Sequence, residues 1–543
     1  MNVIPQALRK GSALGEDYVR GQHAQELYEY DLRDGQSLRR RAEWLDASRQ
    51  RPRVDRNSLV EVLGDYNARY NGSPEVKGSL EKLKDERTLV VVGGQQSGLF
   101  TGSLLVIYKA ATIIHAARLA SEELGRDVVP VFWIAGEDHD WDEADHTYVL
   151  TSELEVRRLR MESWHDGKSS VSGVKVPTEE WEKAIAELEL TLADSEYKAE
   201  IMELLRSELP QSLSLSEGFA RLLGRLFGRY GLVLVDSADP ALRRLETPMF
   251  ERLIERNDEF EAAYLRAAER IEAAGYEQQA QAVEGAANLF YIQEGQRLLL
   301  YKQDGKFVDR RGTVILTKEE LLERLRRCPE CFSNNVLTRP LMQDYLFPVL
   351  QAVLGLGEIA YWAGTKDGFE TAGMQMPILL PRMSFTLLDP STKKHMEHYG
   401  LTFEDVMERF GSRKEAWLAE QDKLGMDDLF EQAKAEFEQL YKPVIERLGE
   451  LQAGLANLGE INREKIARQI AFLQEKTKQT IARQNEAELR RWDRIYKTLF
   501  PLDRPQERVY TVFYVLNRYG LDWVDELMKI EPDLNGGHRI IEA

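Results

Sequence analysis

The chain has 543 residues, with 72 Lys and Arg against 91 Asp and Glu, so its formal net charge is −19. At roughly 150 residues per domain this length predicts several domains, and the 43% hydrophobic and 30% charged fractions are those of a folded globular protein. A chain this acidic argues against nucleic-acid binding as the main function, because phosphate backbones attract a surplus of Lys and Arg.

Cysteine content and the first residues bear on the compartment. Cys328 and Cys331 are too few for a disulfide framework, which favours a reducing cytoplasm. Their spacing is that of a zinc half-site or a redox pair, but no second pair completes a zinc site, so an incidental pair is the simpler interpretation. We see no signal-peptide core after Met1 and no run of about 18 apolar residues, and therefore expect a cytoplasmic protein without a membrane span.

The N-terminal part predicts helices, for example over 24–32 and 59–70, where apolar residues are three and four apart. Residues 88–92 then form a β-branched run, typical of a strand buried on both faces. A glycine-rich loop, a helix over 103–119 and a second buried strand over 128–135 follow. This order predicts a βαβ unit and a parallel sheet.

The predicted sheet is then interrupted twice. Residues 145–177 alternate as antiparallel β structure does, and 179–209 have a helical period. A third buried strand over 231–236 ends at Asp236, which can bind a ribose or cap its loop. Helical sequence over 240–275 precedes a second β region over 285–316, with turns at Glu294-Gly295 and Asp304-Gly305.

The last part of the core predicts a helix from Thr338 to about Leu354, with Pro340 in its first turn. We expect sheet elements over 358–362 and 377–380. Residues 509–514 are expected to pack back on the body.

A helical hairpin is predicted over about 427–499. Its first helix carries a seam of leucine and valine residues, and 459–462 are expected to break it from the second helix. Two helices of about 30 residues, at 1.5 Å per residue, make a hairpin about 45 Å long. We interpret it as an antiparallel coiled coil that forms a homodimer; an arm without a partner is the alternative. The seam consists of Leu440, Val444, Leu448, Leu451, Leu455 and Leu458.

The first stretch that predicts chemistry follows the first strand of the sheet. Ligands of parallel sheets bind outside the carboxyl ends of strands, and glycines let a backbone approach a ligand closely. The loop is neither a Walker loop nor GxGxxG, and a tight glycine turn is the alternative. We expect substrate binding by Gln95, Gln96, Ser97, Gly98, Thr101 and Gly102.

The second stretch, from Glu137 to His146, follows the second strand and is rich in carboxylates. His139 can act as a general acid or base, oriented by a neighbouring carboxylate. Glu137 or Asp138 can bind an ammonium group, with Asp140 as a further substrate ligand. His139, His146 and an Asp can instead hold a divalent metal, and a solvated acidic loop is the plain alternative.

Later residues add candidate pocket walls. Glu358, Tyr361 and Trp362 combine an acid with two large aromatic rings; a helix end that leads into a core strand is the alternative. Arg382 follows a predicted strand and can bind a phosphate or carboxylate, or form a surface ion pair.

Four blocks of sequence carry a resemblance to a known family. They are VVxGQQxGLFTG at 91–102, PVFWIAGEDHD at 130–140, GEIAYW at 357–362 and LPRMS at 380–384. In order and spacing they resemble the cysteine-adding enzymes of bacillithiol biosynthesis, over essentially the whole chain.

The resemblance implies an α/β fold: a Rossmann-like core similar to class I nucleotidyltransferases, two connecting-peptide insertions and a C-terminal coiled-coil hairpin that makes a homodimer. With this fold, the sequence divides into 1–85 (helical part of the core), 86–144 (core), 145–228 (first insertion), 229–255 (core), 256–335 (second insertion), 336–425 (core), 426–500 (coiled-coil arm) and 501–543 (C-terminal segment on the body).

The resemblance also implies a reaction: the carboxyl group of cysteine is joined to the amine of glucosaminyl-malate. By analogy with cysteinyl-tRNA synthetase and the mycothiol cysteine ligase, the carboxyl group is activated by ATP as an adenylate. The HIGH-type and KMSKS-type signatures of those relatives have no true match here. The family's adenine nucleotide points to Arg508, Asn517 and Tyr519 as nucleotide-binding residues.

We expect no metal beyond Mg²⁺ with the nucleotide, and neither nucleic acid nor membrane as a partner. Two other functions stay open. One is a metal-dependent hydrolase or transferase that uses Asp138, His139, Asp140 and His146. The other is a non-catalytic nucleotide-binding scaffold that dimerises through its arm.

Overall fold

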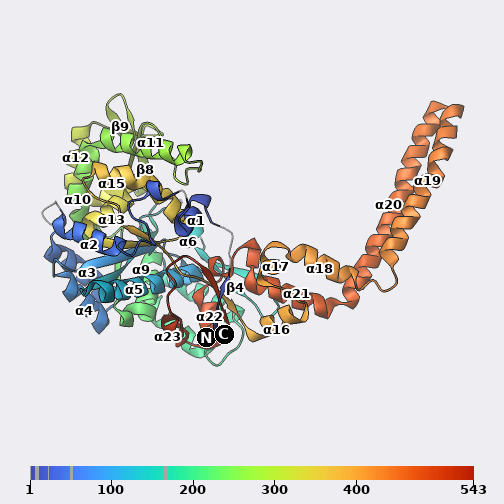
Figure 1. Ribbon diagram of the computed structural model, residues 1–543, viewed down its shortest axis with the longest axis horizontal. Coiled ribbons are helices and arrows are strands. Elements are labelled where there is room, and N and C mark those ends of the chain that lie inside the picture. Colours follow the sequence, from blue (N-terminus) through green and yellow to red (C-terminus); the bar gives the residue numbers. More distant parts are fainter. Residues whose placement is uncertain (1, 7–10, 23, 49–52, 163–168, 543) are drawn as a thin grey trace. The chain divides into compact units, whose positions relative to one another are not determined.

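The computed structural model describes residues 2–6, 11–22, 24–48, 53–162 and 169–542. The chain divides into two compact units, one of residues 1–387 with 504–543 and one of residues 388–503. Figure 1 shows the strands and most short helices in the first unit and a long helical hairpin in the second. Met1, Ala543 and 163–168, which the predicted segments include, lie outside the described residues.

A five-stranded parallel sheet in the order β13-β12-β2-β3-β6 forms the centre of the first unit. Each of the three buried strands expected from apolar runs is present. The order reverses between β2 and β12, because the chain first adds strands on one side of β2 and later on the other. The strands are β2 (Leu89–Gln95), β3 (Val128–Ile134), β6 (Val233–Asp236), β12 (Val349–Leu354) and β13 (Ile378–Pro381).

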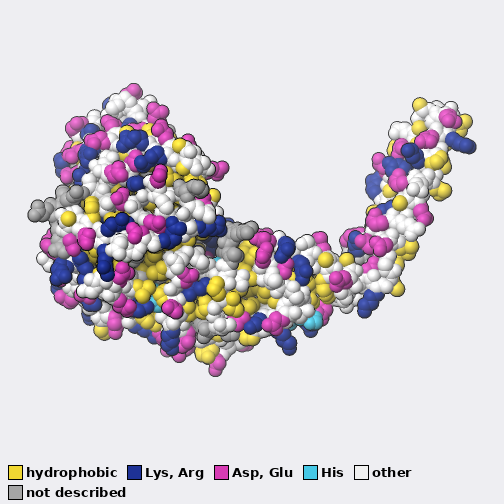
Figure 2. All heavy atoms as spheres, viewed as in Figure 1, with side chains coloured by type: hydrophobic (Ala, Val, Ile, Leu, Met, Phe, Trp, Pro, Cys, Tyr) yellow, Lys and Arg dark blue, Asp and Glu magenta, His cyan; other side chains and the backbone are white. Residues whose placement is uncertain are grey.

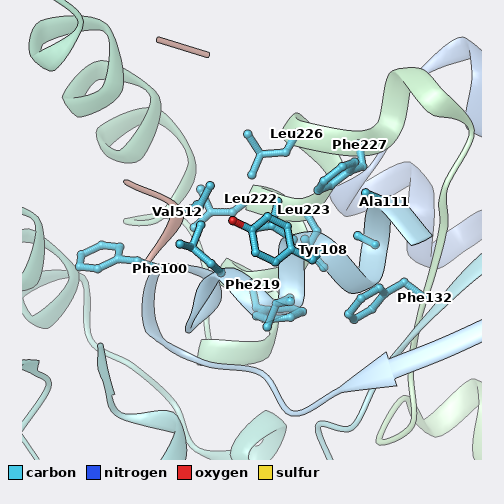
Figure 3. Packing of buried hydrophobic residues seen from close by; sticks show 14 of the residues in the cluster. Phe100, Tyr108, Ala111, Phe132, Phe219, Leu222, Leu223, Leu226, Phe227 and Val512 are labelled. Carbon is cyan, nitrogen blue, oxygen red and sulfur yellow. The ribbon is translucent and has the colours of Figure 1, made fainter. Parts of the chain in front are cut away.

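Both faces of this sheet are buried, since successive side chains of a strand point to opposite faces. On β3, Phe132 and Ile134 belong to one hydrophobic cluster and Val131 and Trp133 to the other. The first cluster is partly visible in Figure 3, where Tyr108 lies near side chains of the helix α9 (Leu215–Phe227).

Helix α5 (Leu104–Leu124) connects β2 to β3 and contacts both strands. It is the one helix among the described residues that is long and apolar enough for a membrane span by composition, but 78% of that window is buried inside the protein. It is therefore a core helix.

Four helices precede the sheet: α1 (Ala13–Arg20), α2 (Ser37–Ala47), α3 (Arg56–Tyr70) and α4 (Pro74–Leu83). The helix expected over 24–32 is wrong, because only Gln25–Leu27 form a 3₁₀ turn and Tyr28 is extended. The N-terminal part also contains a strand that the helical pattern did not predict. This strand, β1 (Asn2–Gln6), pairs with β15 (His538–Glu542), so the two ends of the chain lie side by side (Figure 1); β14 (Ser384–Leu388) completes that sheet.

The first interruption contains the antiparallel pair β4 (His146–Leu150) and β5 (Val156–Arg160), as expected. The single helix expected over 179–209 is two helices, α7 (Thr178–Thr191) and α8 (Lys198–Glu208). The four-residue helix α6 (Trp141–Ala144) comes just before β4.

The second interruption begins with α10 (Pro240–Glu255) and α11 (Asn257–Ala273) and contains an antiparallel sheet in the order β10-β9-β8-β7-β11. Both predicted turns are confirmed as two-residue hairpins, with positive φ at Glu294-Gly295 and Asp304-Gly305. A disulfide joins Cys328 to Cys331. The strands are β7 (Ala286–Gln293), β8 (Gln296–Gln303), β9 (Lys306–Asp309), β10 (Ile315–Leu316) and β11 (Phe332–Asn334), with α12 (Lys318–Arg327) before β11.

The helix expected from Thr338 to Leu354 is wrong in its second half. Helix α13 covers only Arg339–Leu346, and Phe347 is extended because it precedes Pro348. The chain then continues as β12. The strand expected over 358–362 is instead α14 (Leu356–Trp362), where the Glu358 carboxylate accepts from the Gly355 N–H at the helix start; α15 (Lys366–Thr371) follows.

The second unit contains α16 (Pro390–His398), α17 (Phe403–Glu408), α18 (Phe410–Ala419), α19 (Met426–Leu451), α20 (Ala453–Gln484) and α21 (Glu486–Leu499). The antiparallel hairpin of α19 and α20 is present, but its break is at Gln452 and not at 459–462. Gly459 lies inside α20 and does not break it. A β-carbon at this position would be 3.1 Å from Ile445 Cγ1 of α19, so glycine lets the two helices approach closely.

Two last helices, α22 (Val512–Tyr519) and α23 (Trp523–Lys529), lie in the first unit. Their apolar residues, among them Phe513 and Trp523, belong to the same cluster as α5. Figure 2 shows acidic and basic side chains interspersed over the visible face of this unit.

Candidate functional site

A cavity of about 710 Å³ opens at the carboxyl ends of β2, β3 and β12. It lies where the strand order reverses, between β2 and β12, the place where open parallel sheets bind ligands. The walls come from the two predicted loops, from α5, and from the segment after β11 that leads into α13.

The glutamine-bearing turn and the acidic turn meet at this edge, because the Gln96 side-chain amide donates a hydrogen bond to the Asp138 carboxylate. Gly94 lies between the strands for a steric reason: a β-carbon there would be 2.4 Å from the Trp133 carbonyl oxygen. The loops that follow β2 and β3 are therefore in direct contact at the edge of the sheet.

Lys109 of α5 joins two walls of the cavity. Its Nζ donates to Gly94 O at 2.7 Å, to Gln95 Oε1 at 3.0 Å and to Glu358 Oε2 at 2.5 Å. Burial lowers the pKa of Lys109, against the pull of Glu358. Burial would raise the pKa of Glu358, but Lys109 and the Gly355 N–H hold it below its ordinary value. The hydrogen bonds of Lys109 to Gly94, Gln95 and Glu358 fix β2 to α14.

Glu137 is fixed by an ion pair with a buried arginine. Arg243 of α10 forms ion pairs with Glu137 and, at 2.6 Å, with Glu246. Burial raises the pKa of Glu246 to about 7, and Glu137 adds to this by repulsion. The carboxylates of Glu137 and Glu246 thus share the Arg243 guanidinium, and Glu137 is the one that lines the cavity.

Asp138 and His139 face an arginine from the second β region. Burial would raise the pKa of Asp138, but the Gln96 hydrogen bond and Arg297 lower it. His139 Nδ1 lies 3.6 Å from Asp138 Oδ1 and 3.3 Å from Arg297 Nη1. Arg297 lies over the Phe290 ring, 3.8 Å from its centroid, which fixes the guanidinium beside the acidic turn.

The lining also includes Asn334, Arg339 and Tyr361, and the Asn334 carbonyl accepts from Arg297 Nη2 at 2.7 Å. The Arg339 guanidinium donates to the Tyr361 hydroxyl, and burial raises the pKa of Tyr361 to about 12, so this hydroxyl stays protonated. Asn334 is 1% exposed, and within the described chain neither of its amide atoms has a hydrogen-bond partner.

Arg382 and Glu507 form a bidentate ion pair, with Nη1 at 3.0 Å and Nη2 at 2.6 Å from the carboxylate oxygens. Arg508 follows Glu507 and reaches the cavity. Burial and the neighbouring Arg382 lower the pKa of Arg508.

The structure brings eight of the predicted site residues together and places His139 at their edge through its contacts with Asp138 and Arg297. The eight that line the cavity are Gln95, Gln96, Glu137, Asp138, Glu358, Tyr361, Arg382 and Arg508.

Residues of the glycine-rich loop beyond Gln96 do not line the cavity. Ser97 Oγ bonds to Ser216 Oγ at 2.8 Å, and Thr101 is fully buried with φ of 66°. Gly98 and Gly102 contact each other at the turn, where Gly102 has φ of 68°. These residues shape the turn that begins α5, so their predicted contact with substrate has no support here.

Four further predicted residues lie elsewhere. Asp140 caps α6, because its Oδ1 accepts from the Glu143 N–H at 3.2 Å. Trp362 is buried and stacked on Phe369 in the core, so Tyr361 is the aromatic wall. Asn517 donates to Ala193 O at 2.9 Å, and Tyr519 packs against the first hydrophobic cluster. Of the three predicted nucleotide residues, only Arg508 reaches the cavity.

The predicted metal ligands are dispersed. His146 Nδ1 lies 3.0 Å from Asp145 and from Arg158, while His139 faces Arg297. Nowhere in the described ranges do three His, Cys, Asp or Glu side chains gather as a metal site requires. The donor set of the metal-dependent alternative is therefore not assembled.

Four residues that build the site were not predicted from the sequence. Lys109 was detectable as a cation in the apolar first half of α5, but Arg243, Arg297 and Arg339 lie in segments that only the fold brings to the sheet edge. Cations outnumber carboxylates in the cavity lining, with Lys109, Arg297, Arg339, Arg382 and Arg508 against Glu137, Asp138 and Glu358. The cavity therefore suits an anionic polar molecule that also carries an amine.

Comparison with known proteins gives full-length matches. The family model described as Bacillithiol biosynthesis BshC, N-terminal Rossmann-like domain, matches residues 1–383, and the model of the BshC C-terminal coiled-coil domain matches 385–543. Proteins named "Putative cysteine ligase BshC" are similar over the chain: one of Geobacillus thermodenitrificans is 37% identical and one of Geobacillus kaustophilus 36%, each with 100% of both chains covered. One of Bacillus cytotoxicus is 36% identical over 90% of both chains.

Proposed function

The chain belongs to the BshC family of cysteine ligases in bacillithiol biosynthesis, and from this premise we propose that it joins the carboxyl group of L-cysteine to the amine of glucosaminyl-malate. The observation that carries the proposal is the contact of Gln96 with Asp138 at the reversal of strand order. The cavity at this point is lined by carboxylates, which can bind an amine, and by lysine and arginine residues, which can bind an anion.

The amine must lose a proton before it can attack a carboxyl carbon. In the proposed mechanism the Asp138 carboxylate, whose pKa is lowered, binds the ammonium form. His139 takes the proton, since its ring lies beside Asp138 at the edge of the cavity. Gln95 and Gln96 orient the substrate through neutral hydrogen bonds, and Glu358 and Tyr361 form the facing wall.

Amide formation also needs an activated carboxyl group. We propose ATP, with Mg²⁺, as the source of this activation, in keeping with the Rossmann-like core. Arg382 and Arg508 are the cations that suit its phosphates. Asn517 and Tyr519 are kept as weaker nucleotide candidates, because they lie outside the cavity lining.

We further propose that the two interruptions of the sheet correspond to connecting peptides of class I nucleotidyltransferases, and that the protein works in the cytoplasm. The arm is proposed to make a homodimer. Figure 2 shows apolar side chains on the surface of the arm. The exposed apolar side chains along α19 and α20 that support the dimer are Leu440, Val444, Leu451, Leu458, Ile461, Phe472 and Leu473.

The direct test is product formation from L-cysteine, glucosaminyl-malate and ATP, followed by mass spectrometry. We expect the wild-type protein to form the amide, and Asp138→Asn and His139→Gln to lower the rate by about 100-fold. Asp304→Asn is the matched control, because Asp304 lies on a hairpin turn whose positive φ suits Asn equally.

The outcomes separate the candidate functions. Absence of product with all three substrates contradicts the ligase proposal and favours a nucleotide-binding scaffold. Product formation at an undiminished rate by His139→Gln contradicts the role of His139 in proton transfer while leaving the reaction in place.

A further inference from the structure

Asn334 is a buried polar residue that the protein itself leaves unsatisfied. Both Oδ1 and Nδ2 are inaccessible and have no partner in the described chain, although the residue lines the cavity. Its neighbour Asn335 shows the ordinary arrangement: its Oδ1 accepts from Leu337 N at 2.9 Å, and its Nδ2 donates to Asn288 at 2.8 Å. A buried amide without partners costs stability, which is typical of a group kept for a ligand.

Arg339, five residues further on, is a cation without a carboxylate partner. Among the described residues it forms no ion pair; its Nη2 donates to Tyr361, and its buried Nε has no partner. Three other cations of the lining are paired: Lys109 with Glu358 at 2.5 Å, Arg382 with Glu507 at 2.6 Å and Arg297 with Asp138 at 3.9 Å. Among the described residues Arg508 forms no ion pair either, but it follows Glu507 and is distant from Asn334 in the sequence. The charge of Arg339 is therefore available to an anion from outside the chain.

We propose that Asn334 and Arg339, here called the amide–arginine corner, bind the carboxylate-bearing end of the acceptor substrate. The inference rests on the proposed function for the identity of that substrate, glucosaminyl-malate, and assigns its malyl end to this wall. The amine then lies toward Asp138, which Arg297 connects to this wall: its Nη2 donates to Asn334 O at 2.7 Å and its Nη1 lies 3.9 Å from Asp138 Oδ1.

The chemistry of the corner selects a hydroxylated carboxylic acid. Arg339 supplies the positive charge and N–H donors for a carboxylate. Asn334 Nδ2 can donate to a carboxylate or ether oxygen, while its Oδ1 needs a donor such as a sugar hydroxyl. The ammonium group of cysteine suits this corner less well, because Arg339 repels it.

Binding of three small molecules, measured by calorimetry on the full chain, tests the proposal: glucosaminyl-malate, methyl glucosaminide, which lacks both carboxylates, and L-cysteine. We expect Asn334→Leu and Arg339→Met each to lower the affinity for glucosaminyl-malate by at least about tenfold. This is the effect of losing one hydrogen bond to a charged group. Affinities for methyl glucosaminide and cysteine should change by less than about twofold.

Two controls separate binding from folding. Arg324→Met removes another arginine that donates to a tyrosine hydroxyl, Tyr291 at 3.0 Å, outside the cavity, and should leave all three affinities unchanged. Asn335→Leu should lower Tm because it removes satisfied bonds, whereas Asn334→Leu should leave Tm unchanged or raise it. If Asn334→Leu does not fold, Asn334→Asp replaces it, and the added charge should repel the carboxylate.

Unchanged affinity of both variants for glucosaminyl-malate overturns the proposal, and so does a loss confined to cysteine or failure of the wild type to bind the acceptor. Failure of the ligase proposal is read separately: in that case the wild type forms no product, while the carboxylate-dependent binding and its loss in the two variants remain. If product forms and the variants bind normally, the corner is wrong and the ligase proposal stands.

Discussion

At the scale of single residues, the Lys109–Glu358 pair organises the site. Lys109 is fully buried, and its Nζ connects β2 to the first turn of α14. Removal of one partner of a buried pair leaves the other charge uncompensated. The pair therefore determines how well the Gln95 turn and the Tyr361 wall keep their positions.

We predict that Lys109→Met lowers the free energy of unfolding by roughly 3 kcal/mol, because Glu358 loses its cation. The double variant Lys109→Met with Glu358→Gln should recover a large part of that loss. Urea denaturation of the wild type, both single variants and the double variant measures the coupling. Strictly additive effects would show that the two side chains do not interact.

A pH dependence is expected from His538. Its ring nitrogens lie 2.8 Å from Ser384 Oγ and 2.9 Å from Thr386 Oγ1, and burial lowers its pKa to about 4, against roughly 6.5 for an unfolded histidine. The unfolded chain therefore binds a proton first as the pH falls. The stability that the neutral ring provides is present above about pH 6.5 and is lost between about 6.5 and 4.

Unfolding free energies at several pH values between 4 and 7 measure this effect. We expect His538→Gln to flatten the fall of stability with falling pH relative to the wild type. Burial also lowers the pKa of His115 to about 4. His115 therefore also lowers stability as the pH falls, and it does so in the wild type and the variant alike. An identical pH profile for both proteins would contradict a neutral buried His538.

At the scale of elements, the close packing of β2 on β3 depends on glycine. We predict that Gly94→Ala lowers both Tm and product formation, because the new β-carbon would meet the Trp133 carbonyl. Gly357→Ala is the matched control: it also lines the cavity, has open space around it and lies in α14. It should raise Tm slightly, since alanine favours a helix by up to about 1 kcal/mol.

Thermal unfolding and product formation are measured for Gly94→Ala and Gly357→Ala side by side. Both glycines line the same cavity, so a difference between the variants reports the packing of β2 on β3. Equal tolerance of the two substitutions would mean that β2 and β3 can separate without cost. Loss of activity in Gly357→Ala at unchanged Tm would instead place substrate against that glycine.

The buried strands were predictable because continuous β-branched runs admit few other structures. The order α13, β12, α14 was not, because the apolar pattern over 338–362 suits helix and strand alike. Pro348 decides it by making Phe347 extended. The two loops of the site were predictable from their place after buried strands, whereas Arg297 of β8 and Arg339 of α13 reach the cavity only through the tertiary fold.

At the scale of the whole molecule, the chain combines a unit built on a parallel sheet with a second unit that contains a long helical hairpin. Leu440 and Leu458 are 74% and 61% exposed, although they belong to the apolar seam expected for a coiled coil. Exposed apolar residues in such a row are typical of an interface with another chain.

We predict that Leu440→Glu with Leu458→Glu converts a dimer into a monomer, measured by light scattering after size exclusion. The cavity lies in the other unit, so nucleotide-independent binding of glucosaminyl-malate should persist. Glu450→Gln, an exposed substitution on the same arm, is the control and should leave the mass unchanged. A monomeric wild type would contradict the dimerisation role of the arm.

We propose that one cavity, where the order of the parallel strands reverses, holds the acceptor between the acidic turn and the amide–arginine corner. A crystal soaked with glucosaminyl-malate tests this placement. We expect density in the 710 Å³ cavity, with the amine toward Asp138 and a carboxylate at Arg339. Density for the acceptor at any other place on the protein, with this cavity free of it, would show that the cavity is not the acceptor site.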